Sequence, residues 1–185
     1  FGDLDGDGDA DMVIGDYNGM LHYFNNTAGA GNPVTFALTQ PNYQGIDVGS
    51  FAAPQIIDID RDGKKDLLIG EQAGNLNYYW NTGTTSVPTF SLVSSNFGGV
   101  KVNKQGFITG FSYPFLFDRG GSYNLLVGSE NGYLYHYNNI DGRLDSAFNL
   151  VDSMYQKIWE GTRTAPNGAD VNNDGLLDLI VGNYA

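Results

Sequence analysis

One segment recurs four times along this chain, and the repetition limits what the chain can fold into. Each copy places a polar stretch before three apolar residues and a glycine. The copies end at Gly15, Gly70, Gly128 and Gly182, so they are 55, 58 and 54 residues apart. A repeat of about this length is typical of propellers, solenoids and arrays, in which each unit packs against its neighbours.

Each period contains four short segments typical of β-strands, because they are rich in β-branched and aromatic residues and bounded by Gly, Asn or Pro. The third segment of the second copy carries Leu76 and Tyr78 on one face and Tyr79 on the other. A strand with two apolar faces lies between layers. Four-stranded sheets stacked face to face by repetition are the blades of a β-propeller. In the second copy the strands are predicted at 55–59, 67–71, 76–80 and 89–93.

The sequence therefore predicts an all-β fold, with β-propeller blades of four antiparallel strands. About three blades and the start of a fourth are present, and a propeller needs about 4–8 blades to close. The chain begins at Phe1 and ends at Ala185, inside the repeated motif at both ends, so we expect a fragment of a larger propeller with targeting signals outside it. The repeats are predicted at about 1–54, 55–112, 113–165 and 166–185.

The polar stretch of the first copy spaces its oxygens for a metal ion. Alternate carboxylates can point inward around a tight turn, Gly8 can take the sharp bend, and a last carboxylate closes the site from the following strand. Hard oxygen ligands without His or Cys favour Ca²⁺ over zinc or copper, and Mg²⁺ resists so crowded a site. The predicted ligands are Asp3, Asp5, Asp7, the Asp9 carbonyl and Asp11.

The same spacing recurs in the second and fourth copies, so about three Ca²⁺ ions are expected. The third copy is two residues shorter and has Gly and Ser at the ligand places, so no metal is predicted there. In the fourth copy a neutral Asn should weaken the site. The predicted ligands of the second copy are Asp58, Asp60, Asp62, the Lys64 carbonyl and Asp66. Those of the fourth copy are Asp170, Asn172, Asp174, the Leu176 carbonyl and Asp178.

Asp and Gly are also ordinary turn residues, so a single copy could be an acidic turn without a metal. Charge favours the metal. Asp and Glu number 21 against 9 Lys and Arg, for a net charge of −12, and 12 of the 21 acids lie in the three turns. Two like charges 4 Å apart cost about 4 kcal/mol at an effective dielectric of 20. The acidity also argues against a nucleic-acid partner, and no apolar run approaches the ~20 residues of a membrane span.

These residues resemble the FG-GAP/VCBS repeats of integrin-type β-propellers. Phe1-Gly2-Asp3 is similar to the start of that motif, and the spaced acids with the apolar triplet and Gly are similar to its calcium loop. The resemblance implies a propeller, usually seven-bladed, with calcium on one face, in a secreted or cell-surface protein. The Asn-Thr-Gly-x-x-x-x-Pro-x-Phe connection between the third and fourth strands is most similar to that in surface proteins of Bacteroidota. Many of those proteins are exported by the type IX secretion machinery. In that phylum Asp-Ser-apolar is an O-glycosylation sequon, to which Ser146 and Ser153 are similar. At both serines, an ordinary polar turn explains the residues at least as well as a glycosylation site does.

Two functional classes remain open. The first is a calcium-stabilised structural or interaction module, adhesin-like, with an unknown protein or glycan partner. The second is the propeller of a glycan-active enzyme, a lyase or hydrolase. The residues favour the first class, a module that is not an enzyme. His22 and His136 occupy different repeat positions, and paired carboxylates occur only in the metal turns. Aromatic residues in or near loops could bind a partner, although packing between blades explains each one equally well: Tyr17, Tyr43, Phe51, Phe97, Phe111, Tyr113, Tyr123 and Tyr133.

Overall fold

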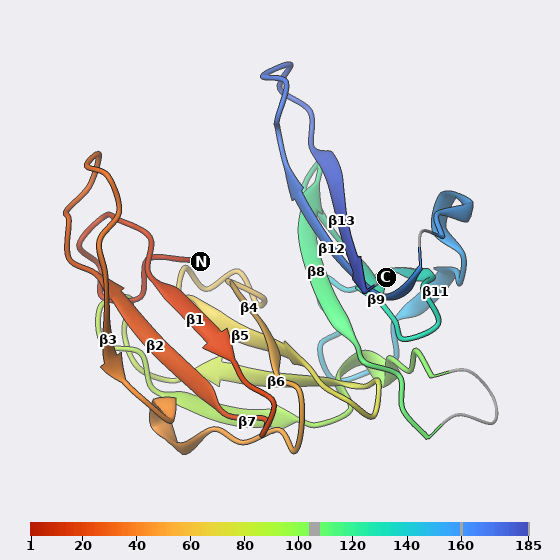
Figure 1. The fold of residues 1–185 in the computed structure, drawn as a ribbon, viewed down its shortest axis with the longest axis horizontal. Coiled ribbons are helices and arrows are strands. Elements are labelled where there is room, and N and C mark those ends of the chain that lie inside the picture. The colour runs from red at the N-terminus through yellow and green to blue at the C-terminus, as the bar shows by residue number, and fades with distance from the viewer. Residues whose placement is uncertain (104–107, 160, 185) are drawn as a thin grey trace.

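Thirteen strands in four antiparallel sheets make up the described part of the chain (Figure 1). The computed structural model describes residues 1–103, 108–159 and 161–184. Within each sheet the strands follow one another in sequence order. Sheet 1 contains β1 (Met12–Gly15), β2 (Leu21–Asn26) and β3 (Phe36–Gln40). Sheet 2 contains β4 (Ala53–Ile57), β5 (Asp66–Gly70), β6 (Leu76–Asn81) and β7 (Phe90–Ser94). Sheet 3 contains β8 (Tyr113–Arg119), β9 (Ser122–Gly128), β10 (Leu134–Asn138) and β11 (Asn149–Asp152), and sheet 4 contains β12 (Thr162–Ala169) and β13 (Asp178–Tyr184).

The all-β prediction is confirmed, since the described residues contain no α-helix. Three 3₁₀ turns, η1 (Tyr43–Gly45), η2 (Phe97–Gly99) and η3 (Tyr155–Lys157), follow the last strands of sheets 1, 2 and 3. No described segment is a helix long and apolar enough to cross a membrane. The four strands predicted in the second copy occur as β4 to β7, with ends displaced by one or two residues.

Sheet 1 has three strands where four per blade were predicted. At the place of its first strand only Gly2 pairs, exchanging two backbone hydrogen bonds of 3.1 and 3.0 Å with Asp11. The bridge still fixes the start of the first acidic turn against β1. Sheets 2 and 3 have the full four strands.

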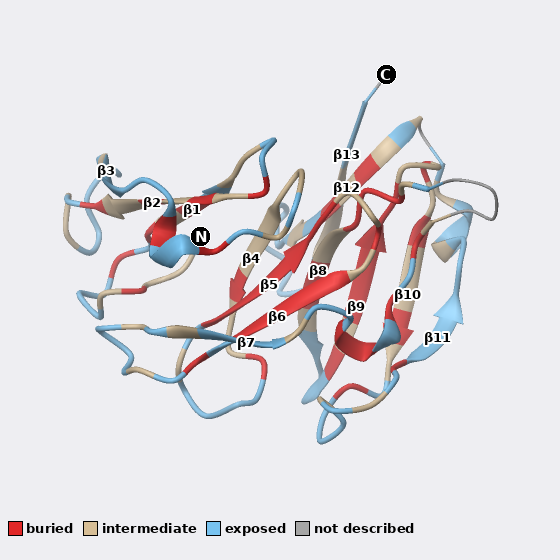
Figure 2. Cartoon of the chain, turned by 90° about the horizontal axis from the view of Figure 1, so that it is seen from below, coloured by how far each residue is buried: buried red, intermediate tan, exposed pale blue. Residues whose placement is uncertain are grey.

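The core lies between the sheets, and the middle strands carry most of it (Figure 2). In β5, Leu67 and Ile69 belong to a cluster shared with sheet 1, whereas Leu68 belongs to a cluster shared with sheet 3. All three side chains have no exposed surface. In β6, Tyr78 and Tyr79 divide between the same two clusters. The prediction that this strand lies between two layers is therefore confirmed.

Polar side chains also join neighbouring sheets. Gln55 in β4 exchanges two hydrogen bonds with the backbone of Leu116 in β8, at 2.8 and 2.7 Å. Gln44, which follows sheet 1, does the same with sheet 2, donating to the Pro88 carbonyl at 3.0 Å and accepting from the Phe90 amide at 2.9 Å. Each glutamine completes an otherwise open backbone pair of the next sheet, so the order of the sheets is fixed by directional bonds as well as by apolar contact.

The recurring glycine that ends each motif is where one sheet meets the next. A Cβ on Gly70 would lie 2.0 Å from the carbonyl oxygen of Ser112, and a Cβ on Gly128 would lie 1.9 Å from that of Thr164. No side chain fits there, which explains why Gly stands at this position. At Gly182, the fourth copy, the nearest atom to such a Cβ is 3.8 Å away.

This difference predicts opposite effects of the same substitution at equivalent positions. Gly70→Ala must push sheets 2 and 3 apart, and we expect it to lower the free energy of unfolding by at least about 1–3 kcal/mol. In the 185-residue chain Gly182→Ala is the matched control, and we expect it to be neutral or to stabilise by up to about 1 kcal/mol, since Gly is unfavourable inside a strand. Urea unfolding of both variants measures the difference, and equal losses of stability would contradict the proposed contact.

Candidate functional site

Three of the four strand-to-strand turns that carry the acidic motif share one backbone geometry. Each has nine residues, numbered here as positions 1 to 9: the first turn is 3–11, the second 58–66 and the fourth 170–178. Positions 4 and 6 are left-handed in all three. At position 6 a glycine has φ of 90°, 89° and 83°, namely Gly8, Gly63 and Gly175. This is the sharp bend for which Gly is required.

The same four hydrogen bonds hold each of these turns. The side chain at position 1 accepts the position-6 N–H at 3.1, 2.9 and 2.8 Å in the first, second and fourth turns. Position 3 accepts the position-5 N–H at 3.2, 3.1 and 2.9 Å. Position 5 accepts the position-7 N–H at 3.0, 2.9 and 2.9 Å. Position 9 accepts the position-2 N–H at 2.9, 3.1 and 3.0 Å. The turns therefore wrap around their own oxygens.

Two of the turns bring three carboxylates together. One oxygen each from Asp3, Asp5 and Asp11 lies within 4.8 Å of the others, and the same holds for Asp58, Asp60 and Asp66. These are positions 1, 3 and 9 of the predicted ligand sets. Such a cluster of hard oxygens can hold a metal ion. In the fourth turn Asp170 and Asp178 provide carboxylates at positions 1 and 9, and Asn172 provides an amide oxygen at position 3.

One oxygen in the second cluster supports this fit. Oδ2 of Asp58 accepts a hydrogen bond from Gly63, but Oδ1 is buried and has no partner in the described residues. A buried carboxylate oxygen without a donor is costly, whereas a bound cation would satisfy it. The donor set, all oxygen and negatively charged, fits Ca²⁺ in particular.

The carboxylate at position 9 is the most enclosed member of each cluster. Asp11 and Asp66 have no exposed surface. Each accepts a second hydrogen bond from a backbone amide at a strand end. Asp11 accepts that of Asn26 in β2 at 2.9 Å, and Asp66 accepts that of Asn81 in β6 at 2.8 Å. Sequence reasoning did not assign a role to these asparagines, although their recurrence at one repeat position was a usable signal. The bonds to the carboxylates come from the backbone amides. The Asn side chains instead hold the chain beyond the strand, since Asn26 accepts the Thr35 amide at 3.0 Å and Asn81 accepts the Thr89 amide at 3.1 Å.

Positions 5 and 7 differ between the turns. In the second turn the Lys64 ammonium pairs with Asp62 at 2.8 Å and donates to the Asn81 carbonyl at 2.8 Å. Burial alone would raise the pKa of Asp62, but the hydrogen bonds from Lys64 outweigh it and lower that pKa. In the first turn position 7 is Asp9, whose side chain is buried. Burial raises the pKa of Asp9 and the neighbouring charge of Asp7 raises it further, whereas the backbone amide of Gly29 lowers it in part.

The fourth turn keeps the hydrogen-bonded shape but is open to solvent. Asp170, Asn172 and Asp174 are exposed, and Asp178 is half-buried. Asp178 at position 9 accepts the Val171 amide at 3.0 Å, and β12 and β13 are the described strands of this sheet. Leu176, whose carbonyl is the predicted position-7 ligand, has a side chain 68% exposed.

The third turn is a tight hairpin of a different kind. Gly120 and Gly121, both left-handed, link β8 to β9. Asp118, which aligns with position 1, forms an ion pair of 2.7 Å with Arg61 of the second turn. The same guanidinium pairs with Asp141 at 2.8 Å. Arg61 holds the pKa of Asp118 below its usual value. An arginine from the neighbouring sheet thus faces these acids, and the absence of metal here stays a prediction.

The opposite end of the strands has a polar turn in sheets 1, 2 and 3. Asp16 accepts the amides of Asn18 and Met20 at 2.9 Å each, and Glu71 accepts that of Ala73 at 2.6 Å. The two histidines are also bound, His22 to Asp16 at 3.2 Å and His136 to Asn124 at 2.9 Å. The histidines lie apart on β2 and β10, each with a separate structural contact.

At this end a row of stacked side chains crosses the sheets. It consists of Tyr17, Phe51, Phe111, Arg163 and Tyr184, and is called the aromatic row here. Phe51 lies 4.5 Å from Tyr17 and 4.8 Å from Phe111, and the Arg163 guanidinium lies 4.0 Å above the Phe111 ring. Phe51, Phe111 and Arg163 occupy one repeat position with φ of 56°, 48° and 52°. Their amides each donate to the preceding polar turn at 3.1 Å, so the backbone sets the stacking.

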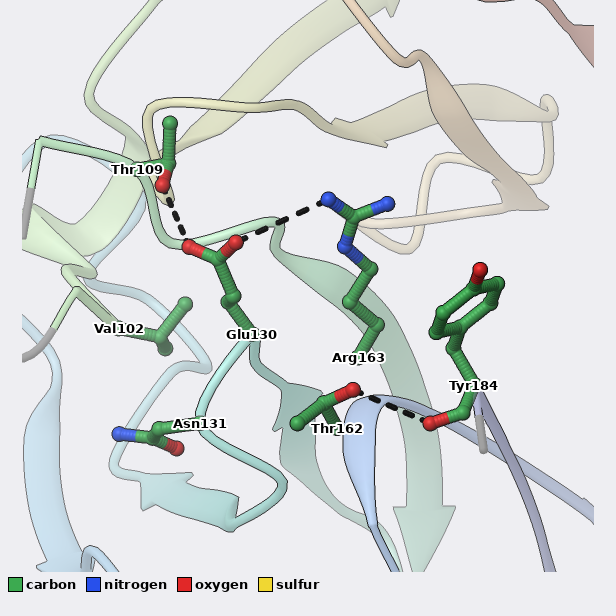
Figure 3. Close-up of a pocket in the computed structure, with 7 residues that line it drawn as sticks. All are labelled: Val102, Thr109, Glu130, Asn131, Thr162, Arg163 and Tyr184. Atoms are coloured by element: carbon green, nitrogen blue, oxygen red, sulfur yellow. Dashed lines mark hydrogen bonds and ion pairs between the residues drawn. The ribbon is translucent and has the colours of Figure 1, made fainter.

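A cavity of about 450 Å³ lies beside the end of the aromatic row (Figure 3). Arg163 lies 3.8 Å from Glu130, and Glu130 also accepts a short hydrogen bond from Thr109. Tyr184 is 67% exposed at the other side of the cavity. The cavity combines an ion pair with an aromatic face, and Arg163 was not identified from the sequence. Its lining residues are Val102, Thr109, Glu130, Asn131, Thr162, Arg163 and Tyr184.

The loop aromatics divide between packing and exposure. Tyr43, Phe97, Phe111 and Tyr123 are buried, as the packing alternative predicts, whereas Tyr17 is 69% exposed. Of the serines considered for glycosylation, Ser146 is half-buried and donates to the Arg143 carbonyl at 3.3 Å, and Ser153 is exposed. Their modification stays a prediction.

Comparison with known families gives one match. The model of the FG-GAP-like repeat matches residues 3–69, a segment that contains the first and second turns and the strands between them. This match supports the FG-GAP resemblance for that part of the chain. Comparison with curated proteins gives no significant match.

The buried carboxylate of Asp66 predicts how stability depends on pH. Burial raises its pKa from 3.8 to about 6. A carboxyl with a higher pKa in the folded state favours folding when protonated, so this stability is fully present below about pH 4 and is lost as pH rises through about 6. After calcium removal, the melting temperature should therefore fall between pH 4 and pH 7. Asp66→Asn should flatten that dependence, and a parent curve no steeper than that of Asp66→Asn would contradict the assignment.

Proposed function

We propose that this chain is a segment of an FG-GAP-type β-propeller whose turns are closed by calcium, and that it acts as a structural and interaction module. The observation that carries the proposal is the repeated turn. Three nine-residue turns share the same four hydrogen bonds, and in two of them three carboxylates converge within 4.8 Å. The gathered charges repel one another, and a bound cation would offset that repulsion.

The arrangement of the sheets supports the propeller. Sheets 2 and 3 have four strands connected in sequence order, and the first strands of neighbouring sheets lie against each other, β4 against β8 and β8 against β12. The apolar clusters on both faces of sheet 2 are those of a blade between two other blades. The blade count and ring closure belong to the proposal.

A non-catalytic role agrees with the side chains. His22 and His136 each have a structural hydrogen bond, and the clustered carboxylates face one another in the turns. Neither arrangement leaves a base beside an open substrate position. We therefore favour a binding module over a glycan lyase or hydrolase.

The cellular setting follows from the resemblance alone. We propose a secreted or cell-surface location. The resemblance to surface proteins of Bacteroidota favours export by the type IX machinery. Ser146 and Ser153 are the candidate O-glycosylation sites. Calcium at extracellular concentration would keep such turns filled. The aromatic row and the adjacent cavity offer stacking and polar groups to a glycan or protein partner.

Removal of one ligand should remove one ion. Asp60→Ala deletes a carboxylate from the second cluster, and we expect it to reduce the calcium stoichiometry by one equivalent in isothermal titration. Saturating calcium should raise the melting temperature of the parent by more than that of the variant, because each ion at 100 times its Kd adds about 2.7 kcal/mol to the free energy of unfolding. Asp145→Ala, an exposed acid outside the turns, is the matched control. Equal stoichiometry in parent and Asp60→Ala would refute the ligand assignment.

Glycan arrays and turnover assays separate the two functional classes. We expect binding without release of reducing ends or unsaturated sugars. Because Tyr17 is the exposed end of the aromatic row, Tyr17→Ala should reduce array binding at least about tenfold. Phe1→Ala removes an exposed aromatic side chain outside the row and is the control. Product formation from any added polysaccharide would instead establish the enzyme.

A further inference from the structure

The contact between sheets 3 and 4 differs in chemistry from the equivalent contact between sheets 1 and 2. In both, a backbone amide donates to the carbonyl of the preceding polar turn at 3.1 Å, from Phe51 to Tyr17 and from Arg163 to Glu130. The backbone therefore brings the same two repeat positions together each time. Between sheets 1 and 2 these positions hold two aromatic rings, 4.5 Å apart. Between sheets 3 and 4 they hold a guanidinium and a carboxylate.

Stability does not explain this charged pair. Arg163 lies 3.8 Å from Glu130, and both side chains are partly exposed. An ion pair this long and this open contributes little to folding. The stack of Tyr17 on Phe51 shows that two rings can fill the same backbone positions. The charged groups are therefore candidates for a role outside the fold.

Both charged groups keep hydrogen-bonding capacity that the protein does not use. A guanidinium carries several N–H donors, and among the described residues the Arg163 side chain makes no hydrogen bond. It is held instead by the ring of Phe111, 4.0 Å away. Glu130 accepts one hydrogen bond from the Thr109 side chain, which leaves lone pairs on its oxygens. Figure 3 shows the Arg163 guanidinium beside the cavity, between the Glu130 carboxylate and the Tyr184 ring.

The charge and shape of the cavity select the kind of ligand. Glu130 and Arg163 are the charged side chains among its lining residues, and because their charges cancel, the cavity offers an ion no net attraction. It offers instead a donor beside an acceptor, with the exposed ring of Tyr184 at its edge. Adjacent hydroxyl groups of a sugar match such a pair, and the C–H face of a sugar ring can stack on an aromatic ring. The cavity volume of about 450 Å³ lies within the range of about 300–1,000 Å³ typical of small-ligand sites.

We propose that this cavity binds one sugar residue of an uncharged glycan. One hydroxyl group donates to the Glu130 carboxylate, the adjacent hydroxyl accepts from the Arg163 guanidinium, and Tyr184 covers the apolar face of the sugar ring. The proposal rests on the interaction role proposed above, and gives that role a ligand class and a place in the fold.

Trp159 provides a signal for binding. Its indole N–H donates at 3.1 Å to the carbonyl of Asn131, which lines the cavity. The chain has two tryptophans, and Trp80→Phe leaves Trp159 as the single reporter. In that background, with calcium present, we expect a saturable fluorescence change with at least one of methyl mannoside, methyl glucoside and methyl galactoside. Methyl glucuronide should bind more weakly, because its carboxylate meets Glu130. Saturation-transfer NMR detects the same binding independently of the indole.

Exchange of the charged pair for the aromatic pair of the earlier contact tests the site. Glu130→Tyr combined with Arg163→Phe imports the Tyr17–Phe51 stack, so we expect a folded chain that has lost the saturable signal. Glu130→Gln removes the carboxylate with almost no change of shape. It should weaken binding of the neutral glycoside at least about tenfold, and strengthen binding of methyl glucuronide. Arg143→Gln, at an exposed arginine between β10 and β11, is the matched control and should bind as the parent does.

Each outcome decides this proposal separately from the calcium clusters, which the stoichiometry of Asp60→Ala tests. Absence of a saturable signal with all three neutral glycosides would overturn it. Tighter binding of methyl glucuronide than of the neutral glycosides would also overturn it, since the cavity would then select a carboxylate. Binding that persists in the folded double variant would leave the interaction role standing but remove it from this cavity. If the double variant fails to fold, Glu130→Gln carries the test, and an unchanged affinity for the neutral glycoside overturns the site.

Discussion

Repulsion between clustered carboxylates is the constraint on which this structure depends. Backbone amides within each nine-residue turn hold the side chains in place, yet these bonds also direct charged oxygens toward one another. In water the carboxylates would separate; in the turn the strands on either side prevent this. A cation converts the repulsion into attraction, and the turn then fixes the spacing of the first two strands of a sheet. The same hydrogen bonds that shape the turn therefore create its need for an ion.

The sheets transmit that local order to the rest of the chain. Position 9 begins the buried second strand, as Asp66 does in β5, and the strand ends at a glycine that contacts the next sheet. An ordered turn thus sets the register of a strand that is packed on both faces. Leu67, Leu68 and Ile69, all without exposed surface, convert this register into contact with two neighbouring sheets.

Much of the fold and part of the site could be predicted from the sequence. The strands of sheet 2 follow from the repeat and from alternating side chains, because Leu76, Tyr78 and Tyr79 are apolar on both faces. Positions 1, 3 and 9 of the turns follow from their spacing. The contact of Asn81 with Asp66 did not, because it is made by a backbone amide, which nearly every residue type carries. The contacts of Arg61 and Arg163 were missed for a related reason. Each arginine contacts residues of a neighbouring repeat, and an alignment of the repeats shows which positions are equivalent but not which positions are in contact.

Arg61 bridges sheets 2 and 3 through its positive charge, in addition to the apolar contact between these sheets. Its guanidinium lies 3.9 Å above the Tyr123 ring and binds two acids of sheet 3, so a covalently attached charge spans sheets 2 and 3. Unlike the ions proposed for the acidic turns, this charge could not be removed by chelation. The contact between sheets 2 and 3 therefore has a positive charge of its own, whatever the ion content of the turns.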